Sequence, residues 1–157
     1  MQTSIYVFVY GTLRQGEIND LARAAERAGL PAPRHAGPGR VRGRLVDFGD
    51  WPGLLPAAAD ARPILGELYL VTPELLALMD QIEEYTPHAS CCFVRADTQA
   101  DTAGGVVACQ YYPIDPAFRG QAPDIDADDW VAYRLSRDAA PPAGTRVASR
   151  HTIRGQT

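Results

Sequence analysis

Two neighbouring carboxylates, Glu83 and Glu84, stand near the end of the segment TPELLALMDQIEEY, residues 72–85. If this segment is a helix, each residue advances about 100° around its axis. Glu83 then falls within the arc of apolar side chains, and Glu84 falls on the opposite side. A carboxylate in apolar surroundings has a raised pKa, which suits proton transfer near neutral pH. The spacing makes Glu83 a candidate general base; the alternative is that it lies at the edge of the apolar arc and pairs with an arginine.

A second candidate is the glycine-containing segment YGTLR, which follows an apolar run and consists of Tyr10, Gly11, Thr12, Leu13 and Arg14. Backbone amides at the end of a strand can form a concave nest that binds anions. The alternative is an ordinary turn between a strand and a helix. The pattern GxxxxGK[ST] is absent, so we do not expect a nucleotide-phosphate loop.

Other chemistry has weaker support. The aspartates of DIDADD, residues 124–129, lack the glycine and the final glutamate of a calcium loop. The cysteines and His88 fit no zinc spacing, so we expect no metal and no organic cofactor. A Cys–His nucleophile pair has no positive support but stays open. Trp51 and Trp130 each follow an aspartate in a loop-like stretch and are candidates to line a pocket, although partial burial in a core is more common.

The elements that must position these residues follow from local patterns. The β-branched and aromatic run at 4–10 predicts a buried strand. Further strands are expected at 40–48, 64–71, 92–97 and 105–112, with a short extended piece within 50–56. Helices are expected at 19–29, capped by Asn19, and at 72–85, capped by Thr72 with Pro73 in the first turn, whereas 31–39 reads as loop and 128–135 as either a helical turn or a strand. This order indicates an α+β fold with a mostly antiparallel or mixed sheet that could curl into a small barrel.

Size and composition limit the number of domains, the possible chemistry and the classes of partner. The 157 residues predict one domain, which we place at 1–137, followed by a tail at 138–157 that could be partly ordered. The net charge is −4, and all 15 basic residues are arginines, so Schiff-base chemistry by a lysine of this chain is excluded. We expect no nucleic-acid partner and, with no apolar run near 20 residues, no membrane partner. Three cysteines form no disulfide framework and the N-terminus is no signal peptide, which favours the cytoplasm.

Six segments, in order along residues 5–133, together resemble the γ-glutamylcyclotransferase-like family. They are VYGTLRQG, GRVRGRLVDFGDWPGL, ILGELYLV, LMDQIEEY, FVRADT and DADDWVAY. The resemblance implies a small mixed β-barrel flanked by helices. It also implies a bacterial enzyme of the γ-glutamylamine branch, linked to glutathione metabolism, that cyclises a γ-glutamyl amide to 5-oxoproline and releases an amine.

The resemblance assigns roles to particular residues. The family's E-G-Y motif maps its catalytic glutamate onto Glu83, and the Y-G-T-L loop maps glutamyl binding onto residues 10–13. Arg14 and Arg95 are candidate orienting charges. One departure is Glu84, which replaces the family's glycine and could change the local backbone freedom and electric field. The sequence leaves open the γ-glutamyl substrate, the oligomeric state, and a non-catalytic binding or regulatory protein on the same fold.

Overall fold

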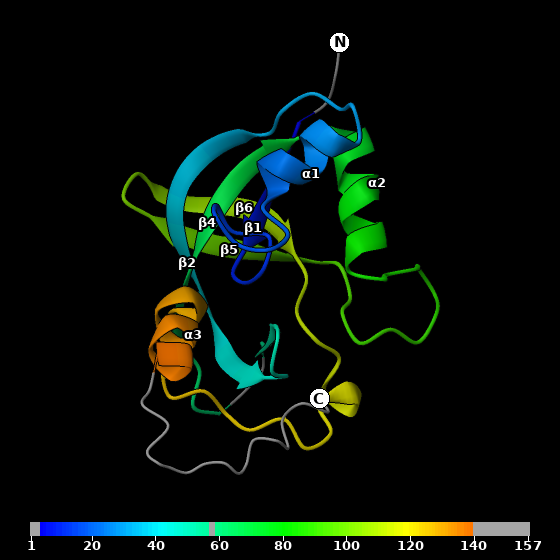
Figure 1. Ribbon diagram of the computed structural model, residues 1–157. Helices are drawn as coiled ribbons and strands as arrows, with labels where there is room; N and C mark the ends of the chain where they lie inside the picture. Colours follow the sequence, from blue (N-terminus) through cyan, green and yellow to red (C-terminus); the bar gives the residue numbers. More distant parts are fainter. Residues whose placement is uncertain (1–3, 57–58, 140–157) are drawn as a thin grey trace.

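The computed structural model describes residues 4–56 and 59–139 (Figure 1). None of the helices in these residues is long and apolar enough to cross a bilayer. The elements, in chain order, are β1 (Ile5–Val9), α1 (Leu21–Arg27), β2 (Arg34–Asp47), β3 (Pro52–Leu55), β4 (Arg62–Val71), α2 (Pro73–Ile82), β5 (Ala96–Thr102), β6 (Gly105–Tyr111), the 3₁₀ turn η1 (Pro116–Phe118) and α3 (Trp130–Ala139).

The strands form a closed barrel. The sheet order is β3-β2-β4-β1-β6-β5, and a further pairing of β2 with β5 closes the ring. β1 runs antiparallel to β4 but parallel to β6, so the barrel is mixed. Helices α1 and α2 cover one side and α3 lies near the opposite end (Figure 1). The predicted small mixed β-barrel flanked by helices is confirmed.

Alternation along β1 divides the core into two parts. Phe8 and Tyr10 belong to a cluster inside the barrel, which also contains Trp130 of α3. Val7 and Val9 point to the other face of the strand, where they pack with α1 and α2 side chains such as Leu75. One short strand therefore fixes both the barrel interior and the position of the helices outside it.

The prediction of a loop at 31–39 was wrong from residue 34 onward, because β2 begins at Arg34. Pro38 lies in this strand opposite Glu67 of β4, and the pairing with β5 involves only Arg40. The first part of β2 thus has one free edge, where a proline removes no ladder hydrogen bond. Gly37 (φ 104°) lies at the adjacent irregularity in register.

The sequence predicted the presence of α1 and α2 correctly, but it predicted the ends of the elements less accurately. Thr72 accepts from the N–H of Leu75 at 3.2 Å and caps α2, as predicted. α1 is capped by Asp20 rather than by Asn19. The segment predicted as a strand at 92–97 lies mostly before β5, which starts at Ala96.

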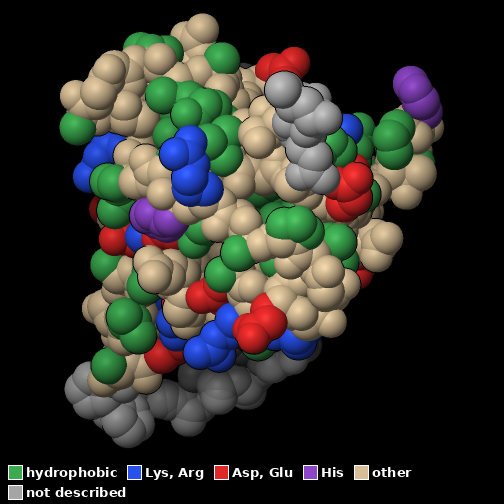
Figure 2. Space-filling view, turned by 90° about the horizontal axis from the view of Figure 1, so that it is seen from above, with side chains coloured by type: hydrophobic (Ala, Val, Ile, Leu, Met, Phe, Trp, Pro, Cys, Tyr) green, Lys and Arg blue, Asp and Glu red, His purple; other side chains and the backbone are tan. Residues whose placement is uncertain are grey.

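The last described residues, 130–139, form a helix. Residues 128–135 contain the start of α3, which continues to Ala139, so residues 138 and 139 are helical. The rest of the predicted tail, 140–157, lies outside the described residues. Basic, acidic and hydrophobic side chains are interspersed over the face seen in Figure 2.

Candidate functional site

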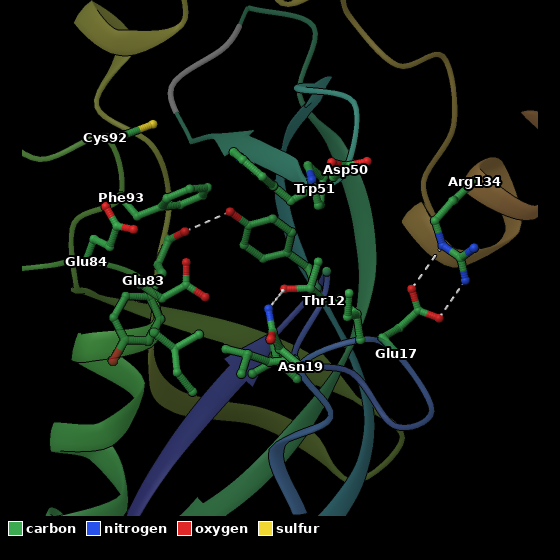
Figure 3. A pocket seen from close by; sticks show the side chains of 18 of the residues that line it. Thr12, Glu17, Asn19, Asp50, Trp51, Glu83, Glu84, Cys92, Phe93 and Arg134 are labelled. Atoms are coloured by element: carbon green, nitrogen blue, oxygen red, sulfur yellow. Dashed lines mark hydrogen bonds and ion pairs between the residues drawn. The ribbon is translucent and has the colours of Figure 1, made fainter. Parts of the chain in front are cut away.

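A cavity of about 930 Å³ opens where the end of β1 meets the end of α2 (Figure 3). The turn between β2 and β3, the segment before β5 and helix α3 complete its wall. Such a volume suits a small-molecule ligand. The cavity is therefore formed by segments from the whole length of the described chain.

Glu83 lies on the cavity wall as the C-terminal cap of α2. Burial, together with the negative charge of Glu84, raises its pKa to about 7. No described residue forms a salt bridge or side-chain hydrogen bond with Glu83. Its carboxylate points toward the side of the cavity where Thr12 lies (Figure 3). A carboxylate in this setting can exchange a proton near neutral pH.

Glu84 is exposed and has a left-handed backbone, with φ 58°. Its N–H donates to the carbonyl of Gln81 at 3.1 Å, and the N–H of Tyr85 donates to that of Asp80 at 2.8 Å. These are the two bonds of a Schellman motif, whose left-handed position normally holds glycine. The helix ends before Glu84, so the motif and not the helical wheel sets the direction of this side chain.

The bend after β1 uses its backbone carbonyls in hydrogen bonds but not its backbone N–H groups. The carbonyls of Gly11, Thr12 and Leu13 accept from the N–H groups of Arg14, Asn19 and Leu21, at 2.9–3.2 Å. Within the part of the chain that the structure describes, the N–H groups of Gly11, Thr12 and Leu13 donate to no acceptor. All three residues line the cavity. Successive free amides of this kind can bind a carboxylate or an oxyanion.

Gly11 is required by packing rather than by an unusual backbone angle. A β-carbon at Gly11 would lie 2.7 Å from Cγ of Pro52. Pro52 is the first residue of β3 and directly follows Trp51, so any side chain at Gly11 would push the bend and the start of β3 apart. The amide of Asn19 also donates to Thr12 Oγ1 at 3.1 Å, which holds the bend from its other side (Figure 3).

Tyr112, just after β6, connects the two halves of the site. Its phenol donates to Asp80 Oδ1 of α2 at 2.6 Å, and its carbonyl accepts from the hydroxyl of Tyr10 at 2.7 Å. Asp80 lies one helical turn before Glu83. The position of the glutamate relative to the bend therefore depends on one tyrosine, and Arg95 supports it by donating to Asp80 Oδ2 at 2.8 Å.

The outer wall of the cavity carries charge and exposed apolar groups. Arg134 of α3 pairs with Glu17 at 2.8 Å (Figure 3). Ile18, Trp51 and Phe118 line the rim with 81%, 43% and 41% of their surfaces exposed, although each is a large hydrophobic residue. Exposed apolar groups beside a pocket are typical of a binding surface.

The structure brings together most, but not all, of the candidate residues named from the sequence. Those that line the cavity are Tyr10, Gly11, Thr12, Leu13, Trp51 and Glu83. Arg14 lies outside the lining and pairs with Glu67 and Asp129. Arg95 pairs with Asp80. Trp130, the first residue of α3, is fully buried because it packs in the cluster inside the barrel.

Sequence reasoning missed several wall residues: Glu17, Asp50, Tyr112, Phe118, Arg134 and Arg137. Glu17 and Arg134 are separated by 117 positions, so no local spacing connects them. Asp50 could have been noticed, because it precedes Trp51 in a short Gly-Asp-Trp-Pro-Gly turn.

The chain matches the model of the family described as gamma-glutamyl cyclotransferase, AIG2-like, over residues 7–132. It is 33% identical over 132 residues to the gamma-L-glutamyl-butirosin B gamma-glutamyl cyclotransferase of Niallia circulans, covering 82% of this chain and 77% of that one. Among solved structures it is similar to an AIG2-like protein of Mus musculus, with a TM-score of 0.65, 23% identity, and coverage of 94% and 97% of the two chains. It is also similar to YkqA of Bacillus subtilis, with a TM-score of 0.67 and 19% identity; the match covers 88% of this chain but spans only 44% of YkqA.

Proposed function

This chain belongs to the gamma-glutamyl cyclotransferase, AIG2-like, family, and from that premise we propose that it cyclises the γ-glutamyl group of an amide to 5-oxoproline and releases the free amine. The family and the relative of known activity make it a cyclotransferase enzyme. The observation that carries the finer proposal is Glu83, a desolvated carboxylate that lines the same cavity as the free amides of residues 11–13.

In this proposal the bend holds the glutamyl group. The N–H groups of Gly11, Thr12 and Leu13 donate to its α-carboxylate or to the oxygen of its γ-carbonyl as negative charge develops there. Tyr10 forms the adjoining wall and is itself fixed through Tyr112. The substrate's own tether brings the α-nitrogen within reach of the γ-carbon, so the enzyme has only to select the folded conformer.

Glu83 moves the proton in both halves of the reaction. It takes a proton from the α-ammonium, and the freed nitrogen attacks the γ-carbonyl carbon, forming the ring bond and a tetrahedral oxyanion. The ring nitrogen then still carries one surplus proton. The oxyanion collapses, the bond from the γ-carbon to the leaving nitrogen breaks, and the protonated Glu83 returns its proton to that nitrogen. The Glu83 carboxylate then takes the surplus proton from the ring nitrogen and passes it to the released amine. The products are 5-oxoproline and the amine as its ammonium ion, and the carboxylate is regenerated.

The acidities of the partners support this role. An α-amino group has a pKa near 8, and burial raises the pKa of Glu83 to about 7. A carboxylate at its ordinary pKa of 4.5 would be a much weaker base toward the same ammonium. The remaining difference is small enough for proton transfer in either direction.

The test is Glu83→Gln, assayed by release of 5-oxoproline from a panel of γ-glutamyl amides. We expect kcat to fall by about 10² or more while the fold stays intact, because glutamine keeps the shape and loses the proton exchange. Glu84→Gln is the matched control, since it removes the neighbouring carboxylate and keeps Glu83. Wild-type turnover by the Glu83 variant would reject the mechanism.

A further inference from the structure

We propose that the outer half of the cavity selects a leaving amine that carries an additional positive charge and no carboxylate, with Asp50 and Trp51 as specificity-determining residues. This inference rests on the proposed cyclotransferase function, because it concerns the part of the substrate that is released. Glu83 and the pair Asp50–Trp51 lie on different sides of the cavity in Figure 3. The glutamyl group held near Glu83 would therefore direct its amide substituent toward this outer wall.

The two arginines of the outer wall, Arg134 and Arg137, already form ion pairs with carboxylates of the chain. Arg134 donates to both oxygens of Glu17, at 3.1 and 2.8 Å. Arg137 donates to both oxygens of Asp47, at 3.0 and 3.1 Å, and to the carbonyl of Gly49 at 2.9 Å. Its Nε also donates to Asp138 at 3.0 Å. A carboxylate on the leaving group would have to break one of these ion pairs to find a partner.

The balance of charge on the wall is negative. Of the residues that the structure describes, five acidic ones line the cavity, Glu17, Asp50, Glu83, Glu84 and Asp138, against two arginines. Even with Glu83 protonated, acidic groups outnumber basic ones. A cleft lined by one sign of charge concentrates the opposite charge, so this cavity attracts a cationic group and repels an anionic one.

Asp50 is the carboxylate best placed to use this field. It is exposed, and among the described residues none forms a salt bridge or side-chain hydrogen bond with it. Trp51, next to it, lines the same cavity with its indole partly exposed. A carboxylate beside an indole gives an ammonium both an ion pair and a cation–π contact.

The size and the apolar rim indicate a long amine. The cavity of about 930 Å³ lies at the upper end of the range for small-molecule sites, which is roughly 300–1,000 Å³. Ile18 and Phe118 line its rim and can cover the methylene groups between the amide and a distal ammonium. A short leaving group that ends in a carboxylate uses neither feature.

Three substrates of equal length test the proposal. They are the γ-glutamyl amides of 1,4-diaminobutane, pentylamine and 5-aminopentanoate, which differ only in ending as ammonium, methyl or carboxylate. We expect kcat/KM to decrease in that order, by about tenfold for each step, and the preference for ammonium to shrink as salt is raised from about 0.01 to 1 M.

Asp50→Asn should reduce the ratio of kcat/KM for the ammonium substrate over the methyl substrate to less than a third of its wild-type value. Asp101→Asn is the matched control, because it removes the same charge from an exposed residue of β5 that does not line the cavity. Its ratio should equal that of the wild type.

The outcomes separate the two proposals. Equal kcat/KM for the three substrates, or an unchanged ratio in Asp50→Asn, would overturn the specificity inference and leave the cyclotransferase standing. Release of 5-oxoproline from none of them, nor from any amide in the wider panel, would overturn the proposed function itself.

Discussion

Glu84 has two separate effects, one on the stability of the fold and one on the pKa of Glu83. It occupies the left-handed position that ends α2, where a side chain is unfavourable relative to glycine. It also places a negative charge next to Glu83, which raises the pKa of that carboxyl. Glu84 thus weakens the fold locally, but it helps to hold the pKa of the proposed base near 7.

Glu84→Gly separates the backbone effect from the charge effect. We expect the free energy of unfolding to rise by about 0.5–1 kcal/mol, because glycine relieves the strain at φ 58° but adds entropy to the unfolded chain. Urea denaturation at constant pH measures this. Glu84→Gln keeps a side chain in the left-handed position and should gain clearly less; equal gains in both variants would contradict the role of strain.

The charge effect should appear in the pH profile of activity. The acid limb of kcat/KM reports the free enzyme's base, so it should lie near 7, where burial holds the pKa of Glu83. Glu84→Gln removes the repulsion that opposes ionisation of Glu83 and should move this limb to lower pH by less than one unit. An unmoved limb, measured between pH 5 and 9, would show that the two carboxylates do not interact.

Stability should depend on pH through the same group. The ordinary pKa of Glu83 is 4.5, and in the folded protein it is about 7. Between these values the native state holds a proton that the unfolded chain lacks, so the contribution of Glu83 to stability falls as pH rises from about 4.5 to about 7.

Glu83→Gln abolishes that loss. We expect this variant to be more stable than the wild type at pH 8, by on the order of 1–3 kcal/mol, and the difference to shrink toward pH 4.5. Denaturant unfolding at several pH values measures it. A stability difference independent of pH would mean that the Glu83 carboxylate is not desolvated.

At the scale of elements, the site depends on how α2 is fixed against the barrel. The helix carries Glu83 at its last turn, and that turn is joined to β6 by the hydrogen bond from Tyr112 to Asp80. The same tyrosine accepts from Tyr10 at the end of β1. Three elements thus meet at one residue, and a small change there alters the distance between the proposed base and the bend.

Tyr112→Phe should lower kcat by about tenfold with little change in KM, because it loosens the Glu83 turn while the glutamyl-binding bend remains. Tyr133→Phe is the matched control: it removes a phenol–carboxylate hydrogen bond of the same length, 2.6 Å, between α3 and Asp47. Both variants should lose some stability. If both lose kcat equally, the role of Tyr112 is only structural.

The elements also differ in how well they can be predicted from the sequence. β1 and α2 were predicted because their signals are local: a β-branched run in one, and a threonine cap with an apolar stripe in the other. The first half of β2 was missed because its Pro and Gly residues read as loop, and only pairing with β4 makes it a strand. The candidate site shows the same contrast between local and tertiary signals. Glu83 and the bend lie in recognisable sequence motifs, whereas Tyr112 and Asp50 line the cavity only because the folded chain brings them there.

At the scale of the whole molecule, Arg14 connects parts of the chain that no spacing could relate. It follows the bend, and its guanidinium pairs with Glu67 of β4 at 3.0 Å and with Asp129 at 2.8 Å. Asp129 in turn accepts from the N–H of Val131 at the start of α3. Only 11% of the Arg14 side chain and 13% of the Glu67 side chain are exposed. The arginine named from the sequence as a candidate for substrate binding therefore ties the bend to the barrel and to the last helix.

Arg14→Met tests this connection. We expect the free energy of unfolding to fall by about 1–3 kcal/mol, because the change removes the guanidinium from the largely buried Glu67 carboxylate, which keeps the N–H of Gln15 as a hydrogen-bond donor. Arg40→Met is the control, since Arg40 is an exposed arginine of β2 whose side chain, within the described residues, donates only to the carbonyl of Pro63. It should cost less than about 1 kcal/mol.

Adding Glu67→Gln to Arg14→Met should restore part of the loss, because it removes the unpaired charge. The two substitutions should then be non-additive by about 1–3 kcal/mol in a double-mutant cycle measured by urea unfolding. Additive losses would mean that Arg14 and Glu67 contribute to stability independently, and that their ion pair does not hold the bend. Because the proposed glutamyl site is that bend, KM for a γ-glutamyl amide should rise in Arg14→Met under conditions where the protein remains folded.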